Sequence, residues 1–263
     1  MKNKKPKALI LLTAVTNCDY ETEYALNLAG TIAERVHIND FIAGKNKLKN
    51  YQILALPGGF SFGDDIAAGK VMANKMKFKL RDQITEFVKA KKPIIGICNG
   101  FQVLVKLGFL PDISSKQEQE TTLAISDVGK FQNRWVYLRP NQLSPSIFTK
   151  GIEKPIYLPI AHGEGRFITK NKTIRETINK KNLIVFQYCD EKGRPTQDSN
   201  PNGSEYNIAG ICNEEGTILG MMPHPDRYIS KFQHPRWTRE NLPEEGDGSV
   251  LFRNAVNYVK NGL

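Results

Sequence analysis

The sequence predicts an α/β protein built on a doubly wound, mixed and mostly parallel sheet that is flanked by helices. In the first half of the chain, short continuous apolar runs alternate with longer segments of helical spacing, as parallel strands and their crossover helices do. In the second half, apolar runs follow one another with polar turns between them, which is typical of antiparallel hairpins. We therefore expect a flavodoxin-like first half that continues into strand hairpins.

The first half is expected to supply the parallel strands and their helices. An apolar run opens it, and Asp19 can cap a following helix in which Tyr24, Leu28 and Ile32 recur at helical spacing. The expected strands are residues 8–13, 36–38, 52–56 and 94–97, and the expected helices are residues 21–35, much of 69–91, and 101–107.

The second half is expected to supply hairpins and a last helix. Its expected strands are residues 135–138, 156–159, 183–188, 208–212 and 218–222, with a hairpin loop at 213–216, polar loops at 112–122, 195–206 and 229–248, and a helix at 250–260. There is no repeat and no clear linker, so we expect residues 1–263 to form one domain. Its catalytic core covers about residues 8–228, and residues 229–263 add a C-terminal loop and helix.

Length and hydropathy exclude several classes of protein. The chain has 263 residues, and no apolar run approaches the roughly 20 residues of a membrane span. The five apolar residues that follow the N-terminal lysines are too few for a signal peptide and fit a first buried strand better. We therefore expect a cytoplasmic protein with no membrane partner.

The distribution of charge and the spacing of the cysteines limit which partners and metals the chain is expected to bind. The formal charge is +10, and much of it lies in residues 70–92, where acidic residues interrupt the basic ones. We interpret this stretch as a solvated helix face, or else as a docking surface for an acidic protein, and it carries no nucleic-acid-binding motif. The four cysteines have neither metal-ligand spacing nor the spacing of a disulfide framework, so no metal is expected.

The most informative motif is Gly96-Ile97-Cys98-Asn99-Gly100, which joins an apolar run to a helical one. A nucleophile on a tight strand-to-helix turn, with glycine two residues away on either side, is the pattern of a nucleophile elbow. At a helix N-terminus, backbone N–H groups favour a thiolate. Cys98 is therefore the candidate nucleophile, the alternative being a small buried cysteine at a strand end. Cys212 nearly repeats the motif but lacks the second glycine and the helix, so it is interpreted as a strand residue.

A thiol nucleophile needs a base, and the chain offers four histidines. His224 directly follows an expected strand, and Asp226 two residues later can orient its imidazole, so these two residues are the candidate catalytic partners of Cys98. His234 has only Arg236 in the corresponding position, and His37 is interpreted as structural. His162 lies in a glycine-rich loop and either contacts substrate or partner, or belongs to a plain turn.

Acyl transfer also needs donors for a developing oxyanion. The backbone N–H of Asn99, just after the nucleophile, is one candidate. Gly59, in the Pro-Gly-Gly sequence that follows another expected strand, is the second. The carboxyl ends of parallel strands lie on one edge of a sheet, so Gly59 and Cys98 are expected on the same edge.

These motifs resemble the class I, triad-type glutamine amidotransferases, and within them the glutaminase subunits of phosphoribosylformylglycinamidine synthases. The resemblance is collinear from about residue 8 to residue 228. It rests on Gly-Ile-Cys-Asn-Gly-Phe-Gln at 96–102, Pro-Gly-Gly-Phe-Ser-Phe-Gly-Asp-Asp at 57–65, Thr-Asn-Cys-Asp at 16–19, Arg-Trp-Val at 134–136, Leu-Pro-Ile-Ala-His-Gly-Glu-Gly-Arg at 158–166, Pro-Asn-Gly-Ser at 201–204 and Gly-Met-Met-Pro-His-Pro at 220–225.

The resemblance implies an activity. Cys98 would attack the side-chain amide of L-glutamine, His224 would move the protons, and water would hydrolyse the resulting thioester. Gln102 would help to hold the substrate, with His162 as a further candidate. The ammonia would pass to an ATP-dependent synthetase subunit of purine biosynthesis, accompanied by a small accessory subunit. ATP and magnesium are expected on that partner and no cofactor in this chain, which has no phosphate-binding Gly-x-x-x-x-Gly-Lys-Ser/Thr motif.

Three departures leave alternatives open. The family usually has glutamate where this chain has Asp226, and the shorter side chain sets the carboxylate back by about 1.5 Å. Residues 229–248 exceed the minimal pattern and are expected to contact a partner or to cover the basic surface. Asp64 and Asp65 are interpreted as a helix cap rather than as metal ligands. An amidotransferase that serves another synthetase, and a catalytically silent regulatory subunit of the same fold, therefore remain as alternative interpretations.

Overall fold

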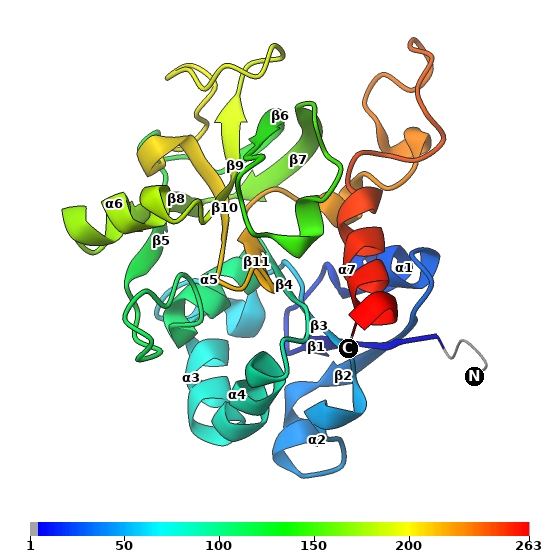
Figure 1. Ribbon diagram of the computed structural model, residues 1–263, viewed down its shortest axis with the longest axis vertical. Helices are drawn as coiled ribbons and strands as arrows, with labels where there is room; N and C mark the ends of the chain where they lie inside the picture. Colours follow the sequence, from blue (N-terminus) through cyan, green and yellow to red (C-terminus); the bar gives the residue numbers. More distant parts are fainter. Residues whose placement is uncertain (1–4, 263) are drawn as a thin grey trace.

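A nine-stranded sheet runs through the molecule in a computed structural model that describes residues 5–262 (Figure 1). The strand order is β2-β1-β3-β4-β11-β10-β9-β6-β7. The strands are β1 (Lys7–Leu12), β2 (Ile32–His37), β3 (Ile53–Leu56), β4 (Ile94–Ile97), β6 (Gln132–Pro140), β7 (Ile156–His162), β9 (Ile184–Cys189), β10 (Ile208–Cys212) and β11 (Ile218–Met221).

The two halves of the sheet differ in direction. Strands β2, β1, β3, β4 and β11 run parallel to one another. From β11 through β10, β9 and β6 to β7, each strand is antiparallel to the next. The last strand in sequence, β11, lies in the middle of the sheet between β4 and β10. The expected mixed α/β sheet with hairpins in the second half is confirmed.

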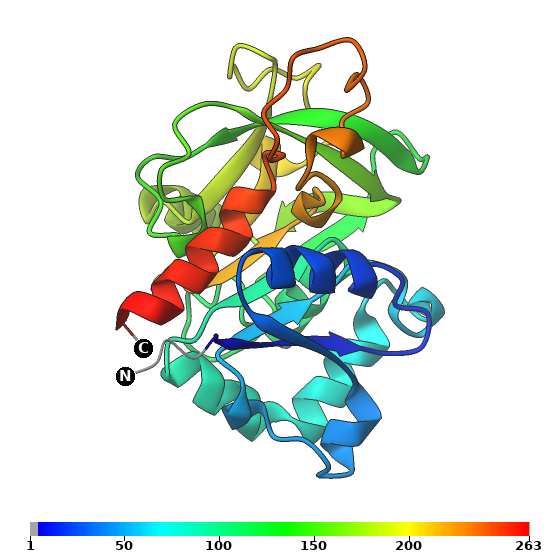
Figure 2. The same ribbon diagram turned by 90° about the vertical axis from the view of Figure 1, so that its right-hand side faces the viewer.

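Helices cover both faces of the parallel half, and one further helix packs against a strand of the second half. They are α1 (Asp19–Leu28), α2 (Ile38–Ile42), α3 (Lys70–Lys79), α4 (Arg81–Lys89), α5 (Asn99–Leu107), α6 (Lys172–Lys180) and α7 (Ser249–Gly262). Helices α1 and α7 pack together on one face, and α3 and α4 lie on the other (Figure 2). Among the described residues, no helix combines the length and the apolar character that crossing a bilayer requires.

The first helix and the second strand differ from the prediction. Helix α1 ends at Leu28 because Gly30, with φ of 101°, turns the chain into β2 from Ile32. The cap position is occupied by Cys18, while Asp19 forms an ion pair with Arg35 instead.

The apolar stripe that predicted the first helix is on its exposed side. Tyr24, Leu28 and Ile32 are all exposed, and the buried side of α1 carries Thr22 and Ala25 among its members. The periodicity located a helix but selected the wrong face, because the buried side combines one large apolar residue, Leu26, with the small or polar residues Asp19, Thr22 and Ala25.

Sequence reasoning also missed some elements. A separate two-stranded sheet pairs β5 (Thr121–Ile125) with β8 (Glu164–Thr169) in antiparallel fashion, and the helix α6 follows β8. Helix α6 has only two apolar residues, Ile174 and Ile178, and only the second is fully buried, so the apolar pattern is too short to stand out in the sequence. The glycine-rich segment at 162–165 is the tight connection between β7 and β8.

Residues 229–248 fold over the aromatic side chains of β6 and β7. The ring of His234 lies 5.6 Å from that of Trp135 and 5.7 Å from that of Tyr157. The carboxylate of Asp247 accepts a hydrogen bond from the backbone N–H of Tyr157 at 2.8 Å. This segment therefore acts as a cover over an aromatic cluster of the antiparallel half before α7 returns to the parallel half.

Candidate active site

Cys98 occupies the turn between β4 and α5, with φ of 50° and ψ of −104°. Positive φ is rare for a residue with a side chain, so the surroundings must hold this conformation. The backbone N–H of Cys98 donates to Met221 O at 2.8 Å. A Cβ on Gly96 would stand 2.7 Å from Gly100 O, and one on Gly100 would run into Leu56 O on β3. Both glycines are therefore required by close backbone packing.

The Cys98 thiol is almost enclosed. The residue is 6 % exposed, and its Sγ lies 3.7 Å from Ala161 O on β7. Because Cys98 precedes the first residue of α5, the positive end of that helix lies beside its side chain.

His224 follows β11 and reaches the same edge of the sheet, which joins β4 to β11 in parallel. Its backbone N–H donates to Pro159 O at 2.9 Å, and its side chain is buried. Its Nδ1 lies 3.4 Å from Oδ1 of Asp226, longer than an ordinary hydrogen bond. The other carboxylate oxygen, Oδ2, accepts a hydrogen bond from the hydroxyl of Thr22 at 2.9 Å.

The surroundings of His224 favour its charged form. Burial is the largest single influence and lowers the pKa of the imidazole, but the Asp226 carboxylate and the thiols of Cys18 and Cys98 together outweigh it. The pKa of His224 is therefore raised well above its usual value. A protonated imidazole next to a thiol is the arrangement of a thiolate–imidazolium pair.

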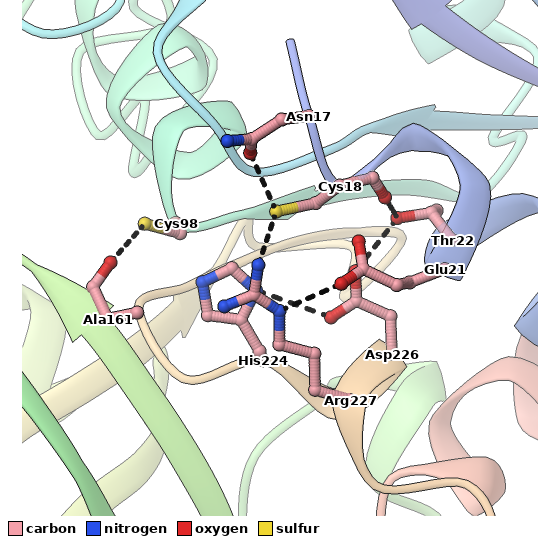
Figure 3. Close-up of polar contacts among 9 residues, drawn as sticks. All are labelled: Asn17, Cys18, Glu21, Thr22, Cys98, Ala161, His224, Asp226 and Arg227. Atoms are coloured by element: carbon pink, nitrogen blue, oxygen red, sulfur yellow. Dashed lines mark hydrogen bonds and ion pairs between the residues drawn. The ribbon is translucent and has the colours of Figure 1, made fainter.

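Gly58 is the point around which these side chains gather. A Cβ at Gly58 would stand 2.6 Å from Cε1 of His224, 3.2 Å from Sγ of Cys18 and 3.5 Å from Cβ of Cys98. Figure 3 shows the imidazole of His224 with the two thiols above it and the carboxylate of Asp226 beside it. Gly58 is thus the residue whose missing side chain makes room for the cluster.

Three residues of this cluster were not assigned to the site from the sequence. Cys18 is buried at the start of α1, and its Sγ accepts a hydrogen bond from Nη2 of Arg227 at 3.0 Å. Arg227 in turn pairs with Glu21 at 3.1 Å, and Thr22 contacts Asp226. For Cys18 the sequence offered two signals, the Thr-Asn-Cys-Asp stretch and a thiol at an expected helix start, whereas nothing gave Thr22 or Arg227 a role.

The two candidate oxyanion donors, Asn99 and Gly59, lie in different backbone structures, one at a helix start and one in an isolated bridge. Asn99 opens α5, so its backbone N–H has no carbonyl partner within the helix. Gly59, with φ of 123°, forms an isolated antiparallel bridge with Thr16, in which the neighbouring Phe60 N–H donates to Val15 O at 3.2 Å. A Cβ on Gly59 would stand 2.7 Å from the backbone nitrogen of Asn17, so glycine is needed for this approach.

Gln102 and His162 both lie near Cys98. The side chain of Gln102 is buried, donating to Glu164 O at 2.5 Å and accepting from Asn99 Nδ2 at 3.0 Å. His162 adjoins Ala161, whose carbonyl faces the Cys98 thiol, and no hydrogen-bond partner reaches either of its ring nitrogens in the described residues. Burial, followed by the charge of His224, lowers the pKa of His162 to about 4, so its imidazole is neutral.

The remaining thiols and histidines lie apart from this cluster. Cys212 ends β10, where its sulfur contacts the hydroxyl of Ser144 and burial raises its pKa to about 11. Cys189 ends β9, and His37 caps α2 by accepting from Asn39 N at 3.2 Å. His234 belongs to the aromatic cluster under residues 229–248.

No metal site is formed by the part of the chain that the structure describes. Its His, Cys, Asp and Glu side chains include no group of three or more that could hold an ion. Asp64 instead accepts hydrogen bonds from Asn99 Nδ2 at 2.9 Å and from the backbone of Gly69, the residue that precedes α3, at 3.3 Å.

Comparison with known proteins gives a consistent result. Residues 5–259 match the model of a family described as "CobB/CobQ-like glutamine amidotransferase domain". The chain is 47 % identical over 258 residues to a protein of Dehalococcoides mccartyi named phosphoribosylformylglycinamidine synthase subunit PurQ, covering 97 % of this chain and 98 % of that protein. A protein of Methanococcus maripaludis with the same name is 42 % identical over 267 residues, covering 96 % and 97 %.

A solved structure extends the similarity to three dimensions. It is described as "Structure of PurLQS from Thermotoga maritima", and one of its chains superimposes with a TM-score of 0.74 at 31 % identity. The match covers 97 % of this chain and 99 % of that one. The likeness therefore spans the nine-stranded sheet and the segments that carry Cys98 and His224.

Proposed function

Because this chain belongs to the family of CobB/CobQ-like glutamine amidotransferase domains, we propose that it is the glutamine-hydrolysing subunit of a phosphoribosylformylglycinamidine synthase. The observation that carries the proposal is the buried cluster around Gly58, where a thiol on a nucleophile elbow meets an imidazole with a raised pKa. A catalytically silent subunit would have no need of a strained cysteine beside a charged histidine.

The chemistry follows from the roles of two residues. The Cys98 thiolate attacks the side-chain amide carbon of glutamine, and the carbonyl oxygen becomes an oxyanion. The imidazolium of His224 donates a proton to the amide nitrogen, so ammonia leaves as the intermediate collapses to a glutamyl thioester. His224, now neutral, accepts a proton from water, which attacks the thioester. Glutamate leaves, and Cys98 and His224 return to their starting forms.

Neighbouring residues support these steps. The backbone N–H groups of Gly59 and Asn99 are proposed to stabilise the oxyanion, since such donors act most strongly in a site without water. Asp226 is proposed to orient His224. The neutral imidazole of His162, whose ring nitrogens have no hydrogen-bond partner among the described residues, is proposed to contact the substrate. Gln102 is proposed to shape the substrate pocket through its bond to Glu164 O.

The ammonia released from glutamine requires a second enzyme that uses it as a substrate. We propose an ATP-dependent synthetase subunit together with a small accessory subunit, with ATP and magnesium bound on the synthetase. Support comes from the names of the relatives and from the described Thermotoga maritima complex. The four free thiols suit the reducing cytoplasm, which we propose as the location. We also propose that residues 1–263 act as one domain, with the core at about 8–228.

The test is reconstitution of the purified chain with its synthetase partners. Amidine formation is measured with glutamine and with ammonium as nitrogen donor. Cys98→Ala should abolish the glutamine reaction and leave the ammonium reaction, whereas Cys212→Ala, which removes a buried thiol far from the cluster, should leave both. Glutamine-dependent synthesis that survives in Cys98→Ala would rule out this nucleophile. Glutamine hydrolysis that depends on Cys98 but supports a different synthetase would show that the client has been misassigned.

A further inference from the structure

The mechanism above uses one thiol, yet the cluster contains two. Cys18 is 1 % exposed, and Figure 3 shows its sulfur beside the imidazole of His224. A Cβ at Gly58 would meet both groups. Cys18 comes from the start of α1 rather than from the elbow. This buried sulfur and the proposed base therefore share one small space, and the mechanism assigns no step to the sulfur.

The hydrogen bonds of Cys18 leave its sulfur with spare acceptor capacity. Its S–H group donates to Oδ1 of Asn17 at 3.3 Å, and its Sγ accepts from Arg227 Nη2 at 3.0 Å. A thiol sulfur has two lone pairs, so one remains for the neighbouring imidazole. Burial raises the pKa of Cys18, which keeps it as the neutral thiol that this arrangement requires.

The imidazole needs such an acceptor. Asp226 Oδ1 remains 3.4 Å from Nδ1, and neither ring nitrogen of His224 makes a hydrogen bond of ordinary geometry with the described residues. A buried imidazolium without such contacts pays a desolvation penalty that one distant carboxylate offsets only in part. The carboxylate cannot simply advance, because Thr22 holds its other oxygen at 2.9 Å.

We propose that Cys18 is a positioning residue for His224, whose sulfur is a second acceptor for the imidazole beside the short carboxylate of Asp226. Arg227 donates a hydrogen bond to that sulfur and holds it in place, and an ion pair with Glu21 holds Arg227. The inference rests on the proposed glutamine hydrolysis. It adds to the same site a residue that positions His224.

Every titratable group that faces His224 has to be considered in a test by pH. These groups are Asp226 and Arg227 on its own segment, Cys18 at the start of α1, Cys98 at the start of α5 and His162 at the end of β7. Cys18, Cys98 and Asp226 raise the pKa of His224. Removing Cys18 alone should therefore lower that pKa while the other groups stay in place.

The experiment compares Cys18→Ala, Cys18→Ser and Cys212→Ala in the reconstituted complex. Cys18→Ala should lower kcat for glutamine about 10-fold with KM within twofold, and should move the alkaline limb of the kcat profile to lower pH. That direction follows because activity is lost as pH rises through the pKa of His224. Cys18→Ser keeps a donor and an acceptor and should recover most of kcat. Cys212→Ala, the matched removal of a buried thiol, should shift nothing.

Two further readouts separate this proposal from the function on which it rests. The ammonium reaction should be unchanged in every variant, which shows that the complex is intact. The pH dependence of Cys98 alkylation by chloroacetamide, measured by mass, reports the thiolate–imidazolium pair without turnover, and its alkaline limb should also move in Cys18→Ala. If the wild-type complex uses no glutamine, the proposed function is wrong. The alkaline part of the pH dependence of Cys98 alkylation then still tests the role of Cys18. An unmoved limb, or equal losses with glutamine and ammonium, overturns the positioning role.

Discussion

Replacing Gly58 by alanine is expected to remove about 99 % of the glutamine-dependent activity while the chain stays folded. The new Cβ would stand 2.6 Å from Cε1 of His224, whereas ordinary carbon–carbon contacts begin near 3.5 Å, so the ring has to move by about 1 Å. The backbone of His224 is tied to Pro159 O and cannot follow freely. A displacement of about 1 Å costs roughly 100-fold in rate, which corresponds to about 2.7 kcal/mol of transition-state stabilisation.

The assay for Gly58→Ala is glutamate release by the reconstituted complex, with ammonium-driven synthesis as the internal reference. Gly163→Ala is the matched control, because a Cβ there would meet only Cδ2 of Phe131 at an ordinary 3.8 Å. Its glutamine activity should stay within about twofold of the wild type, the range expected of a substitution without steric conflict. Wild-type glutamine activity in Gly58→Ala, or an equal loss in Gly163→Ala, would refute the steric reasoning.

Three further predictions concern the partners of His224. Asp226→Glu should bring a carboxylate oxygen closer to Nδ1, from 3.4 Å towards about 2.8 Å, and raise kcat by up to about 10-fold, provided that crystallography shows the longer side chain in the same rotamer; a lower kcat with that geometry would contradict the shortened-orienter argument. Thr22→Val should destabilise the fold by about 1–3 kcal/mol in urea unfolding and lower kcat, because the buried Asp226 carboxylate loses its hydroxyl donor; unchanged values for both would contradict this role. Because the pKa of His224 is raised in the folded protein, its protonation stabilises the fold; this stabilisation is fully present below the pKa of the unfolded chain and is lost as pH rises through the pKa of the folded protein. The melting temperature should therefore fall more steeply above pH 7 in the wild type than in His224→Gln. Parallel curves would contradict the raised pKa.

Local patterns were sufficient to predict β1, β3, β4 and the elbow, although not the start of β2. The run that ends at Cys98 is apolar, flanked by glycines and followed at once by a helix, and each of these signals concerns residues adjacent in sequence. The hairpin between β10 and β11 was predictable for the same reason, because its polar loop separates two apolar runs. The face of α1 was not, because periodicity reveals that a stripe exists and not whether the sheet lies beneath it.

The support around His224 could not be predicted because its contacts join distant parts of the chain. The hydroxyl of Thr22 meets Asp226 across 204 positions, and Cys18 meets Arg227 across 209. No spacing rule covers such pairs, and a cysteine at a helix start does not by itself reveal its contacts. The resemblance identified the stretch around Cys18 as distinctive, but the chemical reason for it required coordinates.

The central place of β11 has a consequence for how the protein is made. Ribosomal synthesis delivers this strand last, yet it is the one that joins the parallel and antiparallel halves and carries His224 at its end. A nascent chain that stops before residue 218 has two incomplete half-sheets with unpaired edges, and pairings across such long sequence separations form slowly. Cys98 therefore remains apart from His224, its proposed base, during synthesis. The insertion of one strand completes the sheet and brings His224 to Cys98 in the same event. If these two residues act as proposed, an unfinished chain cannot release ammonia.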